Sequence, residues 1–107
     1  MGIEIKQKEG EVTRVEVREE LTIYTVAAYW ERLQPELSRG AALQLELTKV
    51  TEIDSAGVQL LLALERFSQQ RGGRIELIAP STPVQEMLQL FHLAAAFGAT
   101  AAGGGHG

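Results

Sequence analysis

The sequence predicts a single layered α/β domain: a mixed sheet of about four strands with helices packed mainly on one face. Short segments of alternating apolar and polar residues predict strands, and longer segments with an apolar stripe at helical spacing predict helices. The two kinds of segment alternate in the second half of the chain. With 107 residues, 45% of them hydrophobic, the chain is long enough to form one core although it has no cysteines. We expect the domain to span residues 1–93, and residues 94–107 to form a flexible Ala- and Gly-rich tail.

The first segments predict a β-hairpin followed by a helix. Strands are predicted at residues 3–7 and 12–17, on either side of a turn at Gly10. Residues 21–24 are read as a short extended or turn segment that leads to Thr25, a candidate N-cap. We expect the following helix to end near Gly40, a residue suited to the left-handed C′ position. Pro35 can kink this helix or end it early.

The apolar stripe of this first helix indicates which side chains are buried. It consists of Val26, Trp30, Leu33 and Leu37, at spacings of four, three and four residues. Trp30 is therefore assigned to the core. Tyr29 falls on the neighbouring face, where it can be exposed.

The centre of the chain predicts a strand, a polar corner and a second helix. The strand is placed at residues 43–47, the corner is Asp54-Ser55-Ala56-Gly57, and the apolar helical segment covers residues 58–71. Asp54 is placed to cap this helix, with Ser55 in its first turn. Because a helix N-terminus attracts negative charge, a phosphate on Ser55 would be tolerated there while it stayed exposed to a partner.

The last predicted elements are a strand at residues 74–78 and a third helix. Thr82 is read as its N-cap, Pro83 as its first residue and Gln85 as the second member of a capping box. Its expected buried stripe is Val84, Met87, Leu88 and Phe91.

Composition and motifs argue against several classes of function. The net charge of −4, with both signs interspersed, does not favour nucleic acid or an anionic membrane as partner. The only two histidines, His92 and His106, form no catalytic or metal-binding cluster, and neither Gly-x-Ser-x-Gly nor a phosphate-binding glycine motif is present. Glu52 and Asp54 are more simply a surface acid and a helix cap than an acid/base pair. Without a secretory or membrane-spanning segment, we expect a soluble, cytoplasmic binding module that is not an enzyme and has no cofactor.

An Asp-Ser pair at such a corner is, by itself, typical of an N-cap and nothing more. The wider pattern, at residues 45–47, 53–62 and 71–77 with a further match at residues 20–25, resembles the STAS domain family. That family includes anti-sigma-factor antagonists and the STAS subunit of bacterial lipid-asymmetry transporters. The resemblance covers about residues 12–93 and implies that Ser55 matches the family's regulatory phosphorylation position. In the antagonists, a partner kinase phosphorylates that serine and the phosphate breaks the complex.

The resemblance implies a partner-binding surface around Ser55. We expect its rim to consist of Glu52, Asp54, Ala56, Gly57 and Val58, with Thr22 and Tyr24 at its border. Gly57 has a second interpretation, a close approach of helix to sheet. The expected partner is an anti-sigma factor or serine kinase. The alternatives are the ATPase of a lipid-asymmetry ABC transporter and a chemosensory signalling assembly, and the sequence does not determine the oligomeric state.

Overall fold

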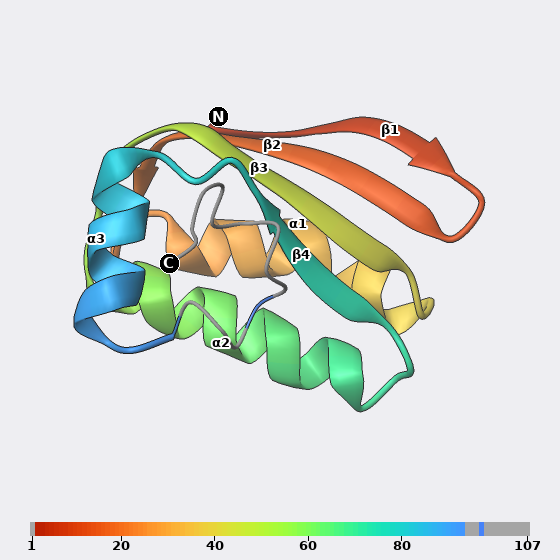
Figure 1. Ribbon diagram of the computed structural model, residues 1–107. Helices are drawn as coiled ribbons and strands as arrows, with labels where there is room; N and C mark the ends of the chain where they lie inside the picture. The colour runs from red at the N-terminus through yellow and green to blue at the C-terminus, as the bar shows by residue number, and fades with distance from the viewer. Residues whose placement is uncertain (1, 94–96, 98–107) are drawn as a thin grey trace.

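The computed structural model describes residues 2–93 and residue 97, and over these residues it contains one four-stranded sheet covered on one side by three helices (Figure 1). The elements follow in the order β1 (Ile3–Glu9), β2 (Val12–Leu21), α1 (Val26–Ser38), β3 (Ala42–Ile53), α2 (Ser55–Gln69), β4 (Arg74–Ile78) and α3 (Thr82–Leu90). The strands lie side by side in sequence order; β1 pairs antiparallel with β2, and the other two pairings are parallel. The predicted fold class is confirmed.

The two central strands are longer than the sequence pattern predicts. The hairpin turns at Gly10, as expected, with a φ of 62°. However, β2 continues to Leu21 instead of ending at residue 17, and β3 continues to Ile53 instead of ending at residue 47. Their pairing has register shifts after Glu16 and after Glu19, and Glu19 has a φ of 64°. Such irregularities change which residues face the core, so strict alternation fails where the strands continue.

The core lies between the inner face of the sheet and the helices. The sheet contributes buried side chains such as Val15, Leu45 and Leu77, and the helices contribute others such as Leu33 and Leu64. Phe97 is also fully buried in this core. The predicted domain boundary at residue 93 thus lies before a core residue. The rest of the predicted tail, residues 94–96 and 98–107, lies outside the described residues.

Two neighbouring aromatic residues of α1 differ in burial from what the sequence predicted. Tyr29 is only 3% exposed, and its hydroxyl donates a hydrogen bond to the Glu20 carbonyl oxygen at 3.1 Å. Trp30 is only partly buried and meets Phe67 of α2 edge-on, with ring centroids 5.3 Å apart. The helix therefore faces the sheet through Tyr29, Leu33 and Leu37, and Trp30 faces the neighbouring helix. Pro35 does not end the helix, which continues to Ser38.

The third helix begins one residue earlier than predicted. Ser81 is its N-cap, and the Ser81 N–H donates to the Leu47 carbonyl oxygen at 3.1 Å, which fixes the start against β3. The predicted capping box does not form, because the Gln85 side chain donates to the Pro80 carbonyl oxygen instead. Phe91, predicted to be buried, follows the helix as its C-cap and is exposed. Among the described residues, no helix is both long enough and apolar enough to span a membrane.

The outer face of the sheet has no helix over it (Figure 1) and carries charged side chains. Its ion pairs connect neighbouring strands: Arg14 Nε lies 3.0 Å from Glu46 Oε2, and Lys49 Nζ lies 3.3 Å from Glu16 Oε2. An antiparallel hairpin beside parallel strands allows this arrangement of one covered face and one solvated face.

Candidate functional site

The candidate site lies where β2 and β3 end. These strands are parallel and finish together, with Leu21 paired to Ile53. The turn at residues 22–25, which leads into α1, is therefore next to the Asp54-Ser55 corner, which leads into α2. Segments 30 residues apart in sequence meet at the carboxyl end of the sheet, the edge at which α/β folds usually place their ligands.

Asp54 holds these two segments together. It is the N-cap of α2, as predicted, and its Oδ1 accepts a hydrogen bond from the Gly57 N–H at 3.0 Å. Its other oxygen, Oδ2, accepts from the Ile23 N–H, also at 3.0 Å. The Ile23 N–H is the main cause of a lowered pKa for the Asp54 carboxyl group, and the Gly57 N–H adds to it. The cap was predicted from sequence; the bond to the 22–25 turn was not.

Ser55 is the first residue of α2 and is exposed, as the sequence analysis expected. Glu52 is also exposed, and Ala56 is half-buried. Gly57 and Val58 are buried, so their predicted place on the exposed rim is wrong. Gly57 instead fits its second interpretation, since a Cβ there would lie 2.1 Å from the Leu21 carbonyl oxygen.

The 22–25 turn is held by its own hydrogen bonds. Thr22 is buried, and its hydroxyl donates to Glu20 Oε1 at 2.9 Å, so it supports the turn from inside and does not border the surface as predicted. The Thr25 hydroxyl accepts from the Thr22 N–H at 3.0 Å. Tyr24, by contrast, is 88% exposed, and its neighbour Ile23 is 62% exposed. Ile23 was not included in the predicted docking surface. Its position as an apolar residue between a strand and an N-cap was the signal that could have found it.

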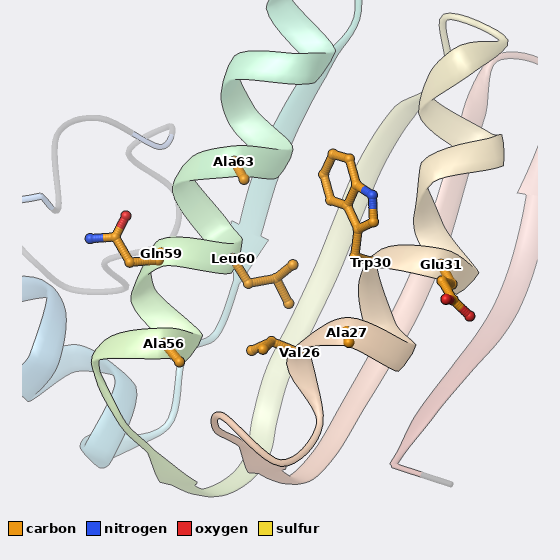
Figure 2. Close-up of a pocket in the computed structure, with 8 residues that line it drawn as sticks. All are labelled: Val26, Ala27, Trp30, Glu31, Ala56, Gln59, Leu60 and Ala63. Atoms are coloured by element: carbon orange, nitrogen blue, oxygen red, sulfur yellow. The ribbon is translucent and has the colours of Figure 1, made fainter.

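An apolar groove continues from this corner between the N-terminal halves of α1 and α2 (Figure 2). Its volume is about 540 Å³. Figure 2 shows the side chains of Val26 and Leu60 converging between the two helices, with Trp30 further along. The lining, which we call the α1–α2 groove, is Val26, Ala27, Trp30, Glu31, Ala56, Gln59, Leu60 and Ala63.

Small residues on facing helix surfaces keep this groove open. Ala27 of α1 and Ala56 and Ala63 of α2 line it without filling it. The groove was not predicted from the sequence, because Val26 and Trp30 were assigned to the buried stripe of the first helix. The three alanines at positions facing the neighbouring helix were the signal that could have found it.

This arrangement provides an exposed hydroxyl at a helix N-terminus, beside apolar surface. No group of His, Cys, Asp and Glu side chains that could hold a metal ion occurs within residues 2–93. His92 lies exposed just after α3, and His106 is outside the described residues.

Comparisons with known proteins place this geometry in context. The family model described as "Mlab, STAS domain" matches residues 5–97. The chain is 26% identical over 77 residues to the anti-sigma-B factor antagonist of Bacillus subtilis (strain 168). The aligned residues cover 72% of this chain and 70% of that protein.

Solved structures share the fold at lower sequence identity. The anti-sigma factor antagonist SpoIIAA in its unphosphorylated form superposes with a TM-score of 0.77 at 21% identity, covering 90% of this chain and 85% of SpoIIAA. The Bacillus cell fate determinant SpoIIAA in its phosphorylated form gives a TM-score of 0.72 at 20% identity, covering 90% and 88%. Since the family model spans most of the chain and the fold agrees with it, this protein belongs to the STAS domain family.

Proposed function

We propose that this STAS domain is a regulatory protein-binding module that acts as a partner switch similar to the anti-sigma-factor antagonists. Its docking surface comprises Ile23, Tyr24, Ser55 and the α1–α2 groove, and phosphorylation of Ser55 controls whether a partner binds. The observation that carries the proposal is the position of Ser55: exposed, first in α2, and directly before Ala56, which lines the groove.

The apolar character of this surface gives a physical reason for the switch. A phosphate adds nearly two negative charges, and a partner that covers apolar surface would have to remove water from them. Glu52 and Asp54 already make the corner acidic, so the phosphate would also repel acidic groups of a partner. Unmodified Ser55 imposes neither cost.

The comparisons support the same proposal. The curated relative is named an anti-sigma-B factor antagonist, and SpoIIAA has been solved in both phosphorylated and unphosphorylated forms. By this analogy, the partner of the unmodified chain is an anti-sigma factor that is also a serine kinase, and Ser55 is its substrate.

The test is an affinity capture from lysate of the native host. The baits are the unmodified chain, Ser55→Ala, Ser55→Asp and, as a matched control, Thr82→Asp, because Thr82 is likewise the exposed first residue of a helix. We expect the unmodified chain, Ser55→Ala and Thr82→Asp to capture a serine kinase or anti-sigma factor, identified by mass spectrometry. Ser55→Asp should not capture it. Equal capture of that protein by Ser55→Ala and Ser55→Asp would contradict the switch.

A second candidate function is the STAS subunit of a lipid-asymmetry ABC transporter. It is favoured by the matched family model, which is described as "Mlab, STAS domain", and by the resemblance of the sequence to a family that includes the STAS subunit of these transporters. In this case an ABC-type ATPase should be captured by all four baits, since the docking would not depend on phosphorylation. Capture of chemosensory proteins would instead indicate an adaptor in that kind of assembly.

A further inference from the structure

We propose that Asp54 is a positioning residue that couples Ser55 to the exposed pair Ile23 and Tyr24. A phosphate on Ser55 would weaken the hydrogen bond from the Ile23 N–H to Asp54, and the 22–25 turn would lose its fixed position. The phosphate would then change the shape of the docking surface as well as its charge. This inference rests on the proposed function, because it concerns regulation of the same site.

The position of the exposed pair depends on backbone contacts more than on side-chain packing. The side chains of Ile23 and Tyr24 are 62% and 88% exposed, so little protein surrounds them. The Tyr24 N–H is bound within the turn, to the Thr22 hydroxyl at 3.3 Å. The Ile23 N–H instead donates out of the turn, to Asp54 Oδ2 at 3.0 Å. This bond therefore ties the exposed pair to α2.

The start of α2 is held by contacts that do not involve Ile23. Asp54 Oδ1 accepts from the Gly57 N–H, and the Asp54 N–H donates to the Leu21 carbonyl oxygen at 3.3 Å. Gly57 also packs so closely on Leu21 that no side chain fits there. Because α2 is fixed against the end of β2 in this way, the contact with Ile23 is the one that can be lost without moving the helix.

A phosphate on Ser55 would act on this contact in two ways. It would bring nearly two negative charges next to the Asp54 carboxylate, which is itself ionised at neutral pH. It would also be attracted to the N–H groups of the first turn of α2, which stabilise an anion at a helix N-terminus, and would therefore stay close to the Asp54 carboxylate. The resulting repulsion favours movement of the carboxylate out of its present position, and the contact with Ile23 is the one that this movement breaks.

The direct test is amide hydrogen exchange, measured by NMR on the full chain with and without phosphoserine at position 55. We expect the Ile23 amide to exchange about tenfold faster in the phosphorylated chain. Repulsion between the phosphate and the Asp54 carboxylate should change the local opening equilibrium of the turn by roughly that factor. The Leu45 amide, in the centre of β3, should exchange at the same rate in both. An unchanged rate at Ile23 would overturn the inference.

A substitution separates the coupling role of Asp54 from its capping role. In Asp54→Ser, the hydroxyl can still cap α2, but its single oxygen, on a shorter side chain, cannot reach both Gly57 and Ile23 as the two carboxylate oxygens do. We expect faster Ile23 exchange in the unphosphorylated variant, little change in melting temperature, and no further acceleration when Ser55 is phosphorylated. Glu9→Gln, which removes an exposed acid at the far end of the hairpin, is the control and should behave as the unmodified chain. Further acceleration by phosphate in Asp54→Ser would show that Asp54 is not the coupling residue.

Failure of this inference is distinguishable from failure of the proposed function. If phosphorylation abolishes partner capture but leaves Ile23 exchange unchanged, the switch stands and the coupling through Asp54 is wrong. If phosphorylation accelerates Ile23 exchange while partner capture is unchanged, the coupling stands and the switch is wrong.

Discussion

At the scale of single residues, the absence of a side chain at Gly57 allows α2 to approach the end of β2. A Cβ at this position would lie 2.1 Å from the Leu21 carbonyl oxygen and 2.9 Å from Ile53 Cγ1. Backbone cannot move aside as a flexible side chain can, so Gly57→Ala must shift the helix. We expect it to lower the free energy of unfolding by about 1–3 kcal/mol, as overpacking does elsewhere, measured by urea denaturation.

The sign of this effect is informative, because alanine normally stabilises a helix interior by about 1 kcal/mol relative to glycine. A Gly57→Ala variant as stable as the unmodified chain would contradict the close approach of α2 to Leu21. The neighbouring substitution Ser55→Ala is the control. It alters an exposed side chain and should change stability by no more than about 0.5 kcal/mol.

At the scale of elements, Glu36 attaches the hairpin to the end of α1. Its carboxylate is buried, with Lys8 Nζ of β1 at 3.1 Å, the Thr13 hydroxyl of β2 at 3.4 Å and the Arg39 guanidinium in contact. Burial raises the pKa of Glu36, but the hydrogen bonds from Lys8 and Arg39 outweigh this effect and the pKa is lowered. The ionised carboxylate is therefore the form that joins the two elements.

Removing the Lys8 partner should destabilise the fold more than removing its neighbour on the same strand. We expect Lys8→Ala to cost about 1 kcal/mol, because it leaves a buried carboxylate with fewer partners. Lys6→Ala is matched in residue type and strand, but its ion pair with Glu4 is exposed at 3.9 Å, so it should cost less than about 0.5 kcal/mol. Equal losses in urea denaturation would contradict the anchoring role of Glu36.

Local signals in the sequence predicted most elements, but not how those elements face one another. The Asp54 cap, the hairpin turn at Gly10 and the helix end at Gly40 depend on neighbouring residues, and all three were predicted correctly. The environments of Tyr29 and Trp30 depend on how α1 is rotated against the sheet and against α2. The spacing of apolar residues locates the stripe but not its edges, so Tyr29 was not recognised as a core residue, while Trp30, predicted to be in the core, is only partly buried.

The candidate site shows the same division between local and long-range information. The position of Ser55 followed from its place in the corner, whereas the bond between Asp54 and Ile23 joins residues 31 positions apart. Gly57 and Val58 were placed on the rim with the other residues around Ser55, because the family resemblance implied a partner-binding surface there. The helical turn instead directs them toward the sheet, where both are buried. The α1–α2 groove is formed by two helices, so the alanines that line it indicate a groove only when both helices are considered together.

At the scale of the whole molecule, an exposed apolar pair, an apolar groove and the exposed Ser55 lie at the same end. Ile23, Tyr24, Ser55 and the α1–α2 groove lie where the parallel strands end. Other large apolar residues are exposed as well, at Val12 and at Leu90 and Phe91, but none of these lines the groove. The outer face of the sheet is instead covered by paired charges, such as Arg14 with Glu46. A solvated charged face is a poor docking surface, because its ion pairs would have to be desolvated. We therefore expect partners to bind at the Ser55 end of the molecule and not on the outer face of the sheet.

This expected docking position gives a prediction for the captured partner, whichever protein it is. Tyr24→Ala should lower its affinity by at least about tenfold, because an exposed aromatic residue beside a groove is typical of the few residues that dominate an interface. The variant should unfold at the same urea concentration as the unmodified chain, since Tyr24 is 88% exposed. Arg14→Ala, on the outer face, is the control and should leave the affinity within about twofold, as expected for a charge outside the interface. Loss of affinity in Arg14→Ala but not in Tyr24→Ala, measured by calorimetry, would place the partner on the outer face of the sheet and contradict docking at the Ser55 corner.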